Sequence, residues 1–88
     1  MTVNFYGRIK EYTNNENVYV PDIKTHSTLR TVLEELSDNY GDLFNNFICS
    51  AENCLFLVNG KGTAHTGGLD TPVNPGDKVE ILPFVEAG

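Results

Sequence analysis

Hydrophobic and polar residues alternate most regularly near the end of the chain. Val79 and Ile81 are separated by Glu80, and this period of two predicts a β-strand with one buried face. Residues 74–77 before it combine Asn, Pro, Gly and Asp, which is typical of a turn because proline presets φ and glycine permits positive φ. Pro83 has no N–H, so we expect regular strand pairing to end there.

The residues after this strand, 84–88, show no pattern of their own. At ~3.3 Å per residue, such a tail reaches about 16 Å from the sheet. We therefore predict a folded domain in residues 1–83 and a C-terminal tail in residues 84–88. The Gly88 carboxylate stands at the end of this slender segment.

Two further alternating stretches lie at the start of the chain. Residues 2–8 alternate hydrophobic and polar side chains and predict a strand, and residues 18–20 predict a second, shorter one. The polar residues 13–17 separate the two, so we expect an antiparallel hairpin. Gly7 is expected to mark a bulge or a close approach of the backbone to a neighbour.

Hydrophobic residues then return at helical spacing and form one face, made of Leu29, Val32, Leu33, Leu36 and Tyr40. Ser27 or Thr28 suits the N-cap of this helix, and Gly41 suits the C-cap. Glu34 and Glu35 lie off the hydrophobic face. Adjacent helical residues do not face each other, so we interpret them as solvated rather than as an acid–base pair. A helix about three turns long and amphipathic must pack against a sheet.

The middle of the chain is less regular. Residues 42–54 are hydrophobic without a clear period, and we expect a loop or a short helical turn that closes the open end of the core. Residues 55–58 predict a third strand. A further short strand is expected near residues 63–66, and Leu69 is expected to fill the core.

Glycine pairs mark two turns in this region. Asn59 and Gly60 both tolerate positive φ and predict a tight turn, and Gly67 and Gly68 predict another. The Asn59–Gly62 sequence is similar to part of a phosphate-binding loop. It lacks the Gly-Lys-Ser/Thr ending and the helix that should follow, so the turn is the better interpretation.

The order is strand, strand, helix, strand, the short strand near residues 63–66 and a final strand. It indicates an α+β fold, with the helix crossing one face of a small mixed sheet. The first and last strands are expected to lie side by side and parallel at the centre of that sheet. This is the β-grasp arrangement.

Composition limits the function further. The chain has 88 residues and a net charge of −6, which suits one small domain with little room for an enclosed active site. The acidic balance argues against binding to nucleic acid or to an anionic membrane surface. It fits a basic partner, or it serves solubility alone. No signal peptide or membrane-spanning stretch is visible, so we expect a cytoplasmic protein.

The cysteines and histidines form no recognisable metal site. Cys49 and Cys54 lack the C-x-x-C spacing, and His26 and His65 are isolated. We interpret all four as structural or incidental residues. A local disulfide has no supporting feature.

The chain resembles the ubiquitin-like sulfur carriers, which include the small subunit of molybdopterin synthase, its thiamine-pathway relative and the small archaeal modifiers. Four stretches carry the resemblance, in residues 28–40, 57–60, 69–73 and 76–83. Two departures stand out. The family typically ends in Gly-Gly, whereas this chain ends in Ala87 and Gly88, and Phe84 stands where many members of the molybdopterin branch have a second proline.

The resemblance implies the β-grasp fold and Gly88 as the reactive group. An ATP-dependent partner adenylates the Gly88 carboxylate, and a sulfur donor converts it to a thiocarboxylate. The sulfur then passes to a second enzyme, such as the large subunit of molybdopterin synthase, in molybdenum or tungsten cofactor synthesis. On this hypothesis the protein is a carrier and not an enzyme, binds no cofactor or metal, and leaves the use of ATP to its partner. The expected partner contacts are Leu82, Phe84, Val85, Glu86 and Ala87.

Two alternatives stay open at this stage. The activated Gly88 is instead joined to lysines, as in a ubiquitin-like modifier, or the protein is a β-grasp interaction domain in which Ala87 records the loss of activation. For Leu82, packing at the edge of the core is as good an interpretation as a partner contact. The position of the stop codon decides whether Gly88 is the encoded end.

Overall fold

The first and last strands of the chain are adjacent and parallel in the interior of the sheet, as predicted. In the computed structural model, which describes residues 1–49 and 54–83, β1 (Thr2–Phe5) pairs with β7 (Lys78–Pro83). Val3 lies opposite Val79, and Phe5 opposite Ile81. The four side chains are buried because they alternate onto the same face of the two strands.

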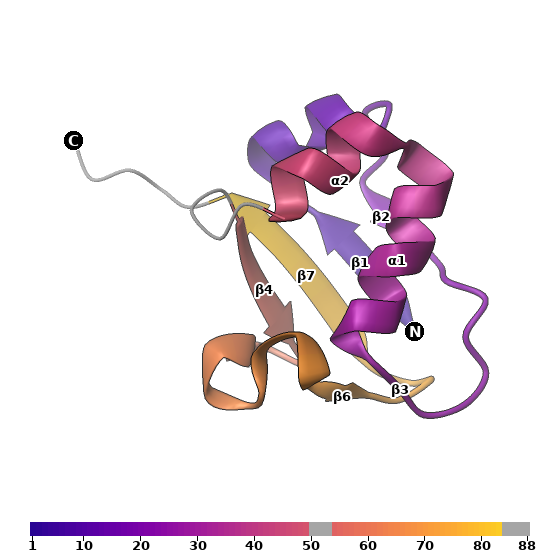
Figure 1. Ribbon diagram of the computed structural model, residues 1–88, viewed down its shortest axis with the longest axis vertical. Coiled ribbons are helices and arrows are strands. Elements are labelled where there is room, and N and C mark those ends of the chain that lie inside the picture. The colour runs from indigo at the N-terminus through magenta and orange to yellow at the C-terminus, as the bar shows by residue number, and fades with distance from the viewer. Residues whose placement is uncertain (50–53, 84–88) are drawn as a thin grey trace.

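The remaining strands extend this pair on both sides (Figure 1). β2 (Val18–Tyr19) is antiparallel to β1, β4 (Cys54–Val58) is antiparallel to β7, and β5 (Lys61–Gly62) is antiparallel to β4. The order across the sheet is β2-β1-β7-β4-β5. β3 (Ser27–Thr28) and β6 (Pro72–Val73) form a separate two-stranded pair.

α1 (Leu29–Tyr40) begins and ends at the predicted residues. The Thr28 side chain accepts a hydrogen bond from the Thr31 N–H, which satisfies a free donor of the first turn. Gly41 ends the helix with a φ of +94°, a conformation that favours glycine. The four predicted aliphatic residues of the helix face are all buried, while Tyr40 is half-buried with its ring edge against Phe5.

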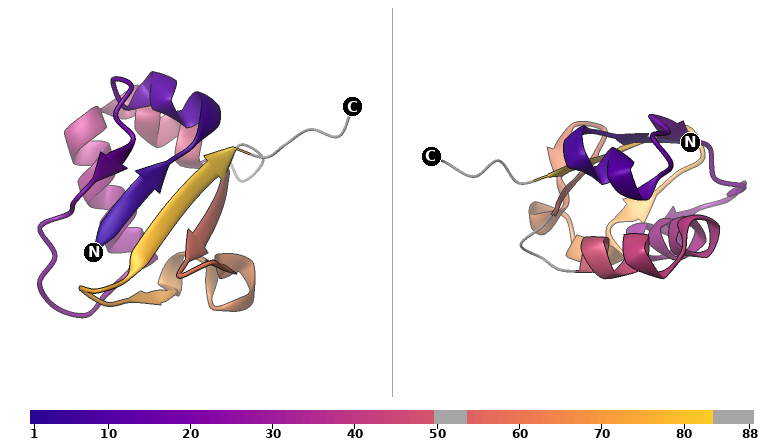
Figure 2. Two further views of the ribbon diagram at one scale, coloured as in Figure 1. Left: turned by 180° about the vertical axis from the view of Figure 1, so that it is seen from behind. Right: turned by 90° about the horizontal axis from the view of Figure 1, so that it is seen from above.

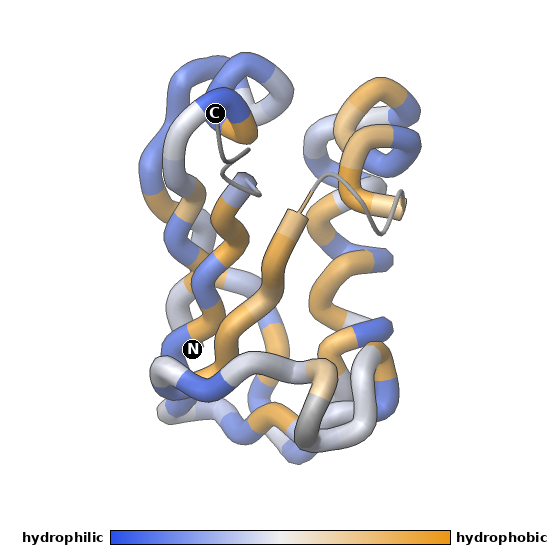
Figure 3. The backbone as a smooth tube through the Cα atoms, turned by 90° about the vertical axis from the view of Figure 1, so that its left-hand side faces the viewer, coloured by the Kyte–Doolittle hydropathy of each residue, from blue (hydrophilic) through white to orange (hydrophobic). Residues whose placement is uncertain are grey.

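The helices and the strands form two layers, with the core between them (Figures 2 and 3). Seen from behind, the strands lie in front of both α-helices, and no described α-helix crosses their other face (Figure 2). This is the predicted α+β, β-grasp fold. Within the described part of the chain, no helix is long and apolar enough to cross a membrane.

Residues 42–49 differ from the expected loop or single turn. They form α2 (Asp42–Cys49), an eight-residue helix that packs beside α1. Phe44 and Ile48 are buried one turn apart, while Leu43 is exposed. Phe47 also packs against the core as a partly buried residue, but a helix of about two turns is too short to show an extended period in the sequence.

The first predicted strand is too long by three residues. Pairing with β7 ends at Phe5, and η1 (Gly7–Tyr12), a 3₁₀ helix, follows. Ile9 of η1 is buried, so the segment after β1 contributes a side chain to the core.

Two predictions between residues 61 and 70 are wrong. The strand expected near residues 63–66 is instead η2 (Thr63–His65), and the short strand lies earlier, at Lys61–Gly62. Leu69 belongs to η3 (Gly68–Asp70) and is 40% exposed, so it does not fill the core. Single 3₁₀ turns carry too few residues to show a period in the sequence.

The turn at Asn59 and Gly60 is confirmed, with φ values of +52° and +83°. Asn59 also joins this turn to the start of β7, because its side chain donates to Asp77 Oδ1 over 3.0 Å and accepts from the Lys78 N–H over 3.0 Å. The hydrogen bond from Asn59 lowers the pKa of Asp77 below its ordinary value of 3.8. The Asn59–Gly62 sequence therefore serves as a turn, and η2 rather than an α-helix follows it.

Candidate functional site

The candidate site is the end of β7 together with the sheet face beside it. Val79 and Ile81 point into the core, so strand alternation places Leu82 on the opposite face. Pro83 is the last described residue and pairs with Cys54 of β4. The other predicted site residues, Phe84, Val85, Glu86, Ala87 and Gly88, lie outside the described residues, as does the predicted tail 84–88.

The outer face, as we call the sheet surface opposite the α-helices, carries several hydrophobic side chains around Leu82. Leu82 is half-buried and lies opposite Leu55, which is 37% exposed. Tyr6 is exposed at the end of β1, and its hydroxyl donates to Glu80 over 2.9 Å. This hydrogen bond raises the pKa of Tyr6. These side chains form a partly exposed apolar surface next to Pro83, and no α-helix in the described part of the chain covers it.

The carboxylates of α1 take a structural role rather than a chemical one. Glu34 is exposed, as expected. Glu35 is only half-exposed, and it accepts hydrogen bonds from the Tyr19 hydroxyl and the Asp22 N–H, each over 3.0 Å. Glu35 thus ties α1 to β2 and to the loop after it. The interpretation as a simple solvated residue missed this contact.

The two cysteines are free thiols in different surroundings. Cys49 ends α2, is exposed, and donates weakly to Asn45 Oδ1 over 3.6 Å. Cys54 begins β4 and is buried, and this burial raises its pKa to about 11. Among the described residues, no group of three His, Cys, Asp or Glu side chains is placed to hold a metal ion.

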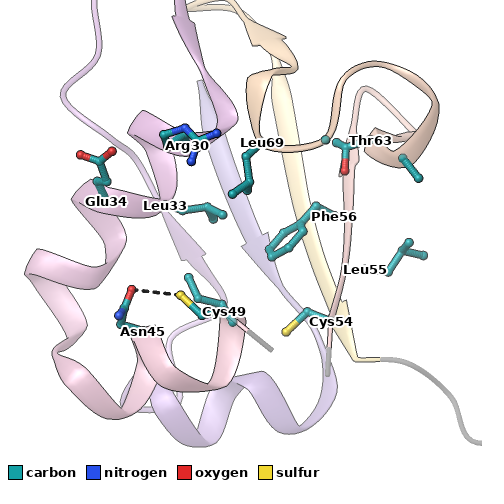
Figure 4. Close-up of a pocket in the computed structure, with 13 residues that line it drawn as sticks. Arg30, Leu33, Glu34, Asn45, Cys49, Cys54, Leu55, Phe56, Thr63 and Leu69 are labelled. Carbon is teal, nitrogen blue, oxygen red and sulfur yellow. Dashed lines mark hydrogen bonds between the residues drawn. The ribbon is translucent and has the colours of Figure 1, made fainter. Parts of the chain in front are cut away.

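A hollow of about 580 Å³, which was not predicted from the sequence, lies between the two α-helices and β4. Leu33, Phe56 and Leu69 converge on it, while Cys49 and Cys54 lie at one end (Figure 4). Leu69, which was expected in the core, instead lines this hollow. At the rim, Arg30 and Asp70 form an exposed ion pair over 3.1 Å. Exposed pairs of this kind add little stability.

The fold and the uncovered sheet face define a ubiquitin-like β-grasp protein. Residues 3–88 match the family model described as the ThiS family, so the chain belongs to that family of ubiquitin-like sulfur carriers and modifiers. The match includes the last residue of the sequence. No curated protein matches the sequence.

Solved structures share the fold over nearly the whole chain. Urm1 from Trypanosoma brucei superposes with a TM-score of 0.80 at 23% identity, covering 99% of this chain and 93% of Urm1. A chain in the BexX/CysO complex of Amycolatopsis orientalis gives 0.79 at 20% identity, covering 99% and 98%. The small archaeal modifier protein 1 of Methanosarcina acetivorans gives 0.76 at 21% identity, covering 99% and 94%. At these identities the likeness establishes the fold.

Proposed function

We propose that this protein is a sulfur carrier whose reactive group is the Gly88 carboxylate. The observation that supports the proposal most directly is membership of the ThiS family over residues 3–88, a match that includes this glycine. Gly88 lies five residues beyond Pro83, where β7 ends. At ~3.3 Å per residue, that distance lets a tail reach about 16 Å into a partner.

The chemistry needs no catalytic group on this chain. In the first step, a partner enzyme joins the Gly88 carboxylate to the AMP part of ATP and releases pyrophosphate. In the second step, sulfide from a donor attacks the acyl-adenylate, forms the C–S bond and expels AMP. The product is a thiocarboxylate, whose sulfur is a nucleophile at neutral pH. Glycine suits the terminus because it has no Cβ and allows a close backbone approach.

The outer face is the proposed docking surface for these partners. Leu82 contributes an apolar side chain there, beside Leu55 and Tyr6. Residues 84–87, predicted as partner contacts, connect this surface to Gly88. Docking through the sheet leaves the core and both α-helices undisturbed. The protein then acts as the substrate of its partner enzymes, in the cytoplasm.

For the acceptor, we propose an enzyme such as the large subunit of molybdopterin synthase, in molybdenum or tungsten cofactor synthesis. The support for this choice is the resemblance of four sequence stretches to a family that includes the small subunit of that enzyme. Transfer of sulfur from the loaded protein to a purified large subunit and its precursor would test the pathway separately from the loading step.

A second candidate is a modifier that is joined to lysines through Gly88. Its support is the fold that this chain shares with the small archaeal modifier protein 1 of Methanosarcina acetivorans. Both candidates begin with adenylation, so they differ in what happens to the activated carboxylate.

Intact-mass analysis separates these candidates. The protein is expressed beside the adenylating and sulfur-transfer enzymes of its host, and its mass is compared with that of the protein expressed alone. We expect a fraction that carries one sulfur in place of one oxygen. Conjugates to lysines of other proteins would favour the modifier. If neither species nor an adenylate forms with a competent enzyme, carrier and modifier both fail, and a non-activated interaction domain is left.

Ala87 provides a second test at the position where the chain departs from Gly-Gly. In an extended backbone with negative φ, alanine is as acceptable as glycine. We propose that the natural activating enzyme accepts the extra methyl group. Ala87→Gly should then change adenylation by that enzyme by about twofold or less, and improve adenylation by an enzyme adapted to Gly-Gly. Rescue of roughly tenfold or more with the natural enzyme would instead indicate a degenerate carrier.

A further inference from the structure

Gly7, the first residue of η1, lies against Pro83, the last described residue of β7. Its φ is +61°, and a Cβ placed on it would lie 2.9 Å from Pro83 Cγ and 3.4 Å from Pro83 Cδ. Carbon atoms in contact prefer about 3.5–4.0 Å, so a side chain at position 7 does not fit without movement. The sequence predicted a bulge or a close approach at Gly7, and the structure confirms the close approach.

Pro83 is thereby held from two sides. On one side it pairs with Cys54 of β4, and on the other its ring contacts Gly7. The segment that carries Gly7 is itself fixed, because the Tyr6 N–H donates to the Ile81 carbonyl over 3.2 Å. Pro83 Cδ is bonded to its own backbone nitrogen, so the ring does not yield like the end of a flexible side chain. A change of ring pucker moves Cγ alone, and any push beyond that is passed through Cδ to the backbone at residue 83.

We propose that Gly7 is a positioning residue for the tail. Its lack of a side chain lets Pro83 lie against η1, and this contact sets the direction in which the chain leaves the sheet towards Gly88. The inference rests on the proposed function. If a partner holds the five residues after Pro83 extended over about 16 Å, a change of about 10° at Pro83 displaces Gly88 by about 3 Å. Displacements of this size are large for a reacting group.

The test compares two alanine substitutions at glycines with the same backbone. Gly7→Ala introduces a Cβ against Pro83 at φ +61°. Gly68→Ala is the matched control, because Gly68 has φ +59° and no heavy atom lies within 4 Å of its added Cβ. Both variants carry the strain of alanine at positive φ, and only the first carries the contact with Pro83.

The measurement is steady-state adenylation by the natural activating enzyme, followed as pyrophosphate release. For Gly7→Ala we expect kcat to fall about tenfold or more, while KM stays within about twofold because the docking side chains of Leu82, Leu55 and Tyr6 are all retained. For Gly68→Ala we expect both constants within about twofold of the unmodified protein. A folded Gly7→Ala with unchanged kcat, or an equal loss in Gly68→Ala, would overturn the proposal.

A double-mutant cycle with Pro83→Ala tests whether the effect passes through the ring. Pro83→Ala removes the Cγ and Cδ atoms that the new side chain would meet. In that background, adding Gly7→Ala should lower kcat by less than about twofold. A loss of kcat that persists undiminished beside Ala at position 83 contradicts the proposal. If Gly7→Ala alone does not fold, the double variant is compared with Pro83→Ala instead. The proposal requires that the double variant folds and is loaded as well as Pro83→Ala. A double variant that does not fold, or is loaded less well, overturns the proposal.

A spectroscopic readout keeps this inference distinct from the proposed function. The NMR resonances of Pro83 Cγ and Cδ and of the Tyr6 amide should move in Gly7→Ala and stay in place in Gly68→Ala. If the unmodified protein is never adenylated while these shifts occur, the proposed function is wrong and the contact stands. If the protein is adenylated and these shifts are absent, the positioning role of Gly7 is wrong.

Discussion

At the scale of single residues, alternation along β7 was a reliable guide. Val79 and Ile81 are fully buried, as the period of two predicts. Leu82 lies on the other face, outside the buried core, and is only half-covered there. Period alone left two interpretations of Leu82 equal, because it gives the face of a residue and not what covers that face.

Leu82→Asp is predicted to weaken binding to the activating enzyme by on the order of 2 kcal/mol, because a charge would enter an apolar contact. The free domain should stay folded. The control is Leu43→Asp, the same change at a leucine that is 75% exposed on α2, and it should leave affinity unchanged. Isothermal titration measures both variants. Unfolding of Leu82→Asp would place Leu82 in the core, and equal affinity for both variants would remove it from the interface.

The two cysteines should differ in reactivity by more than their sequence suggests. With a pKa of about 11, Cys54 holds about one part in a thousand as thiolate at about pH 8, and it is also buried. Cys49 is exposed. Brief treatment of the folded protein with iodoacetamide should therefore label Cys49 and spare Cys54, as peptide mass analysis would show. Raising the pH towards 11 should increase the rate at Cys54. Equal labelling at pH ~8 would show that the start of β4 opens readily.

At the scale of elements, the success of the sequence-based prediction depended on the length of each helix or strand. α1 and β7 are long enough to show a period, and both were predicted within a residue or two of their ends. α2 was missed because it is only eight residues long, so Phe44, Phe47 and Ile48 face the core at helical spacing without a repeat long enough to be recognised. The 3₁₀ segments η1, η2 and η3 have no period to detect, and their positions follow from tertiary contacts such as the burial of Ile9.

The contribution of α2 to the stability of the domain can be measured with substitutions at two neighbouring residues. Phe44 is fully buried, with ring centroids 5.3 Å from Tyr40 and 6.1 Å from Phe5. Phe44→Ala should lower the free energy of unfolding by about 3–5 kcal/mol, since it empties a core position. Leu43→Ala, at an exposed position, should change it by about 0.5 kcal/mol or less. Urea unfolding monitored by circular dichroism gives both values. Similar small effects would mean that α2 is not part of the cooperative core.

At the scale of the whole molecule, the order of the elements predicted the β-grasp fold, and the resemblance to a known family pointed to the same arrangement. Periods identified strands and a helix, but the parallel pairing of β1 with β7 joins residues that are more than seventy positions apart. No local rule specifies such a contact. The reactive end was likewise assigned by resemblance, and the family match over residues 3–88 supports the class of protein while leaving the pathway to experiment.

Removing Ala87 and Gly88 separates the stability of the domain from its function. The core residues that the structure describes lie within positions 3–81, and Pro83 is the last described residue of β7, so we expect the shortened protein to keep its melting temperature to within about 2 °C. It should also bind the activating enzyme through the outer face, yet show no sulfur loading by intact mass, because the new terminus at Glu86 stops about 7 Å short of the reacting position. Adding two glycines after Glu86 should restore loading and exclude an effect of truncation itself. A large fall in melting temperature would show that the last residues stabilise the fold, and loading of the shortened chain would show that Gly88 is not the reactive group.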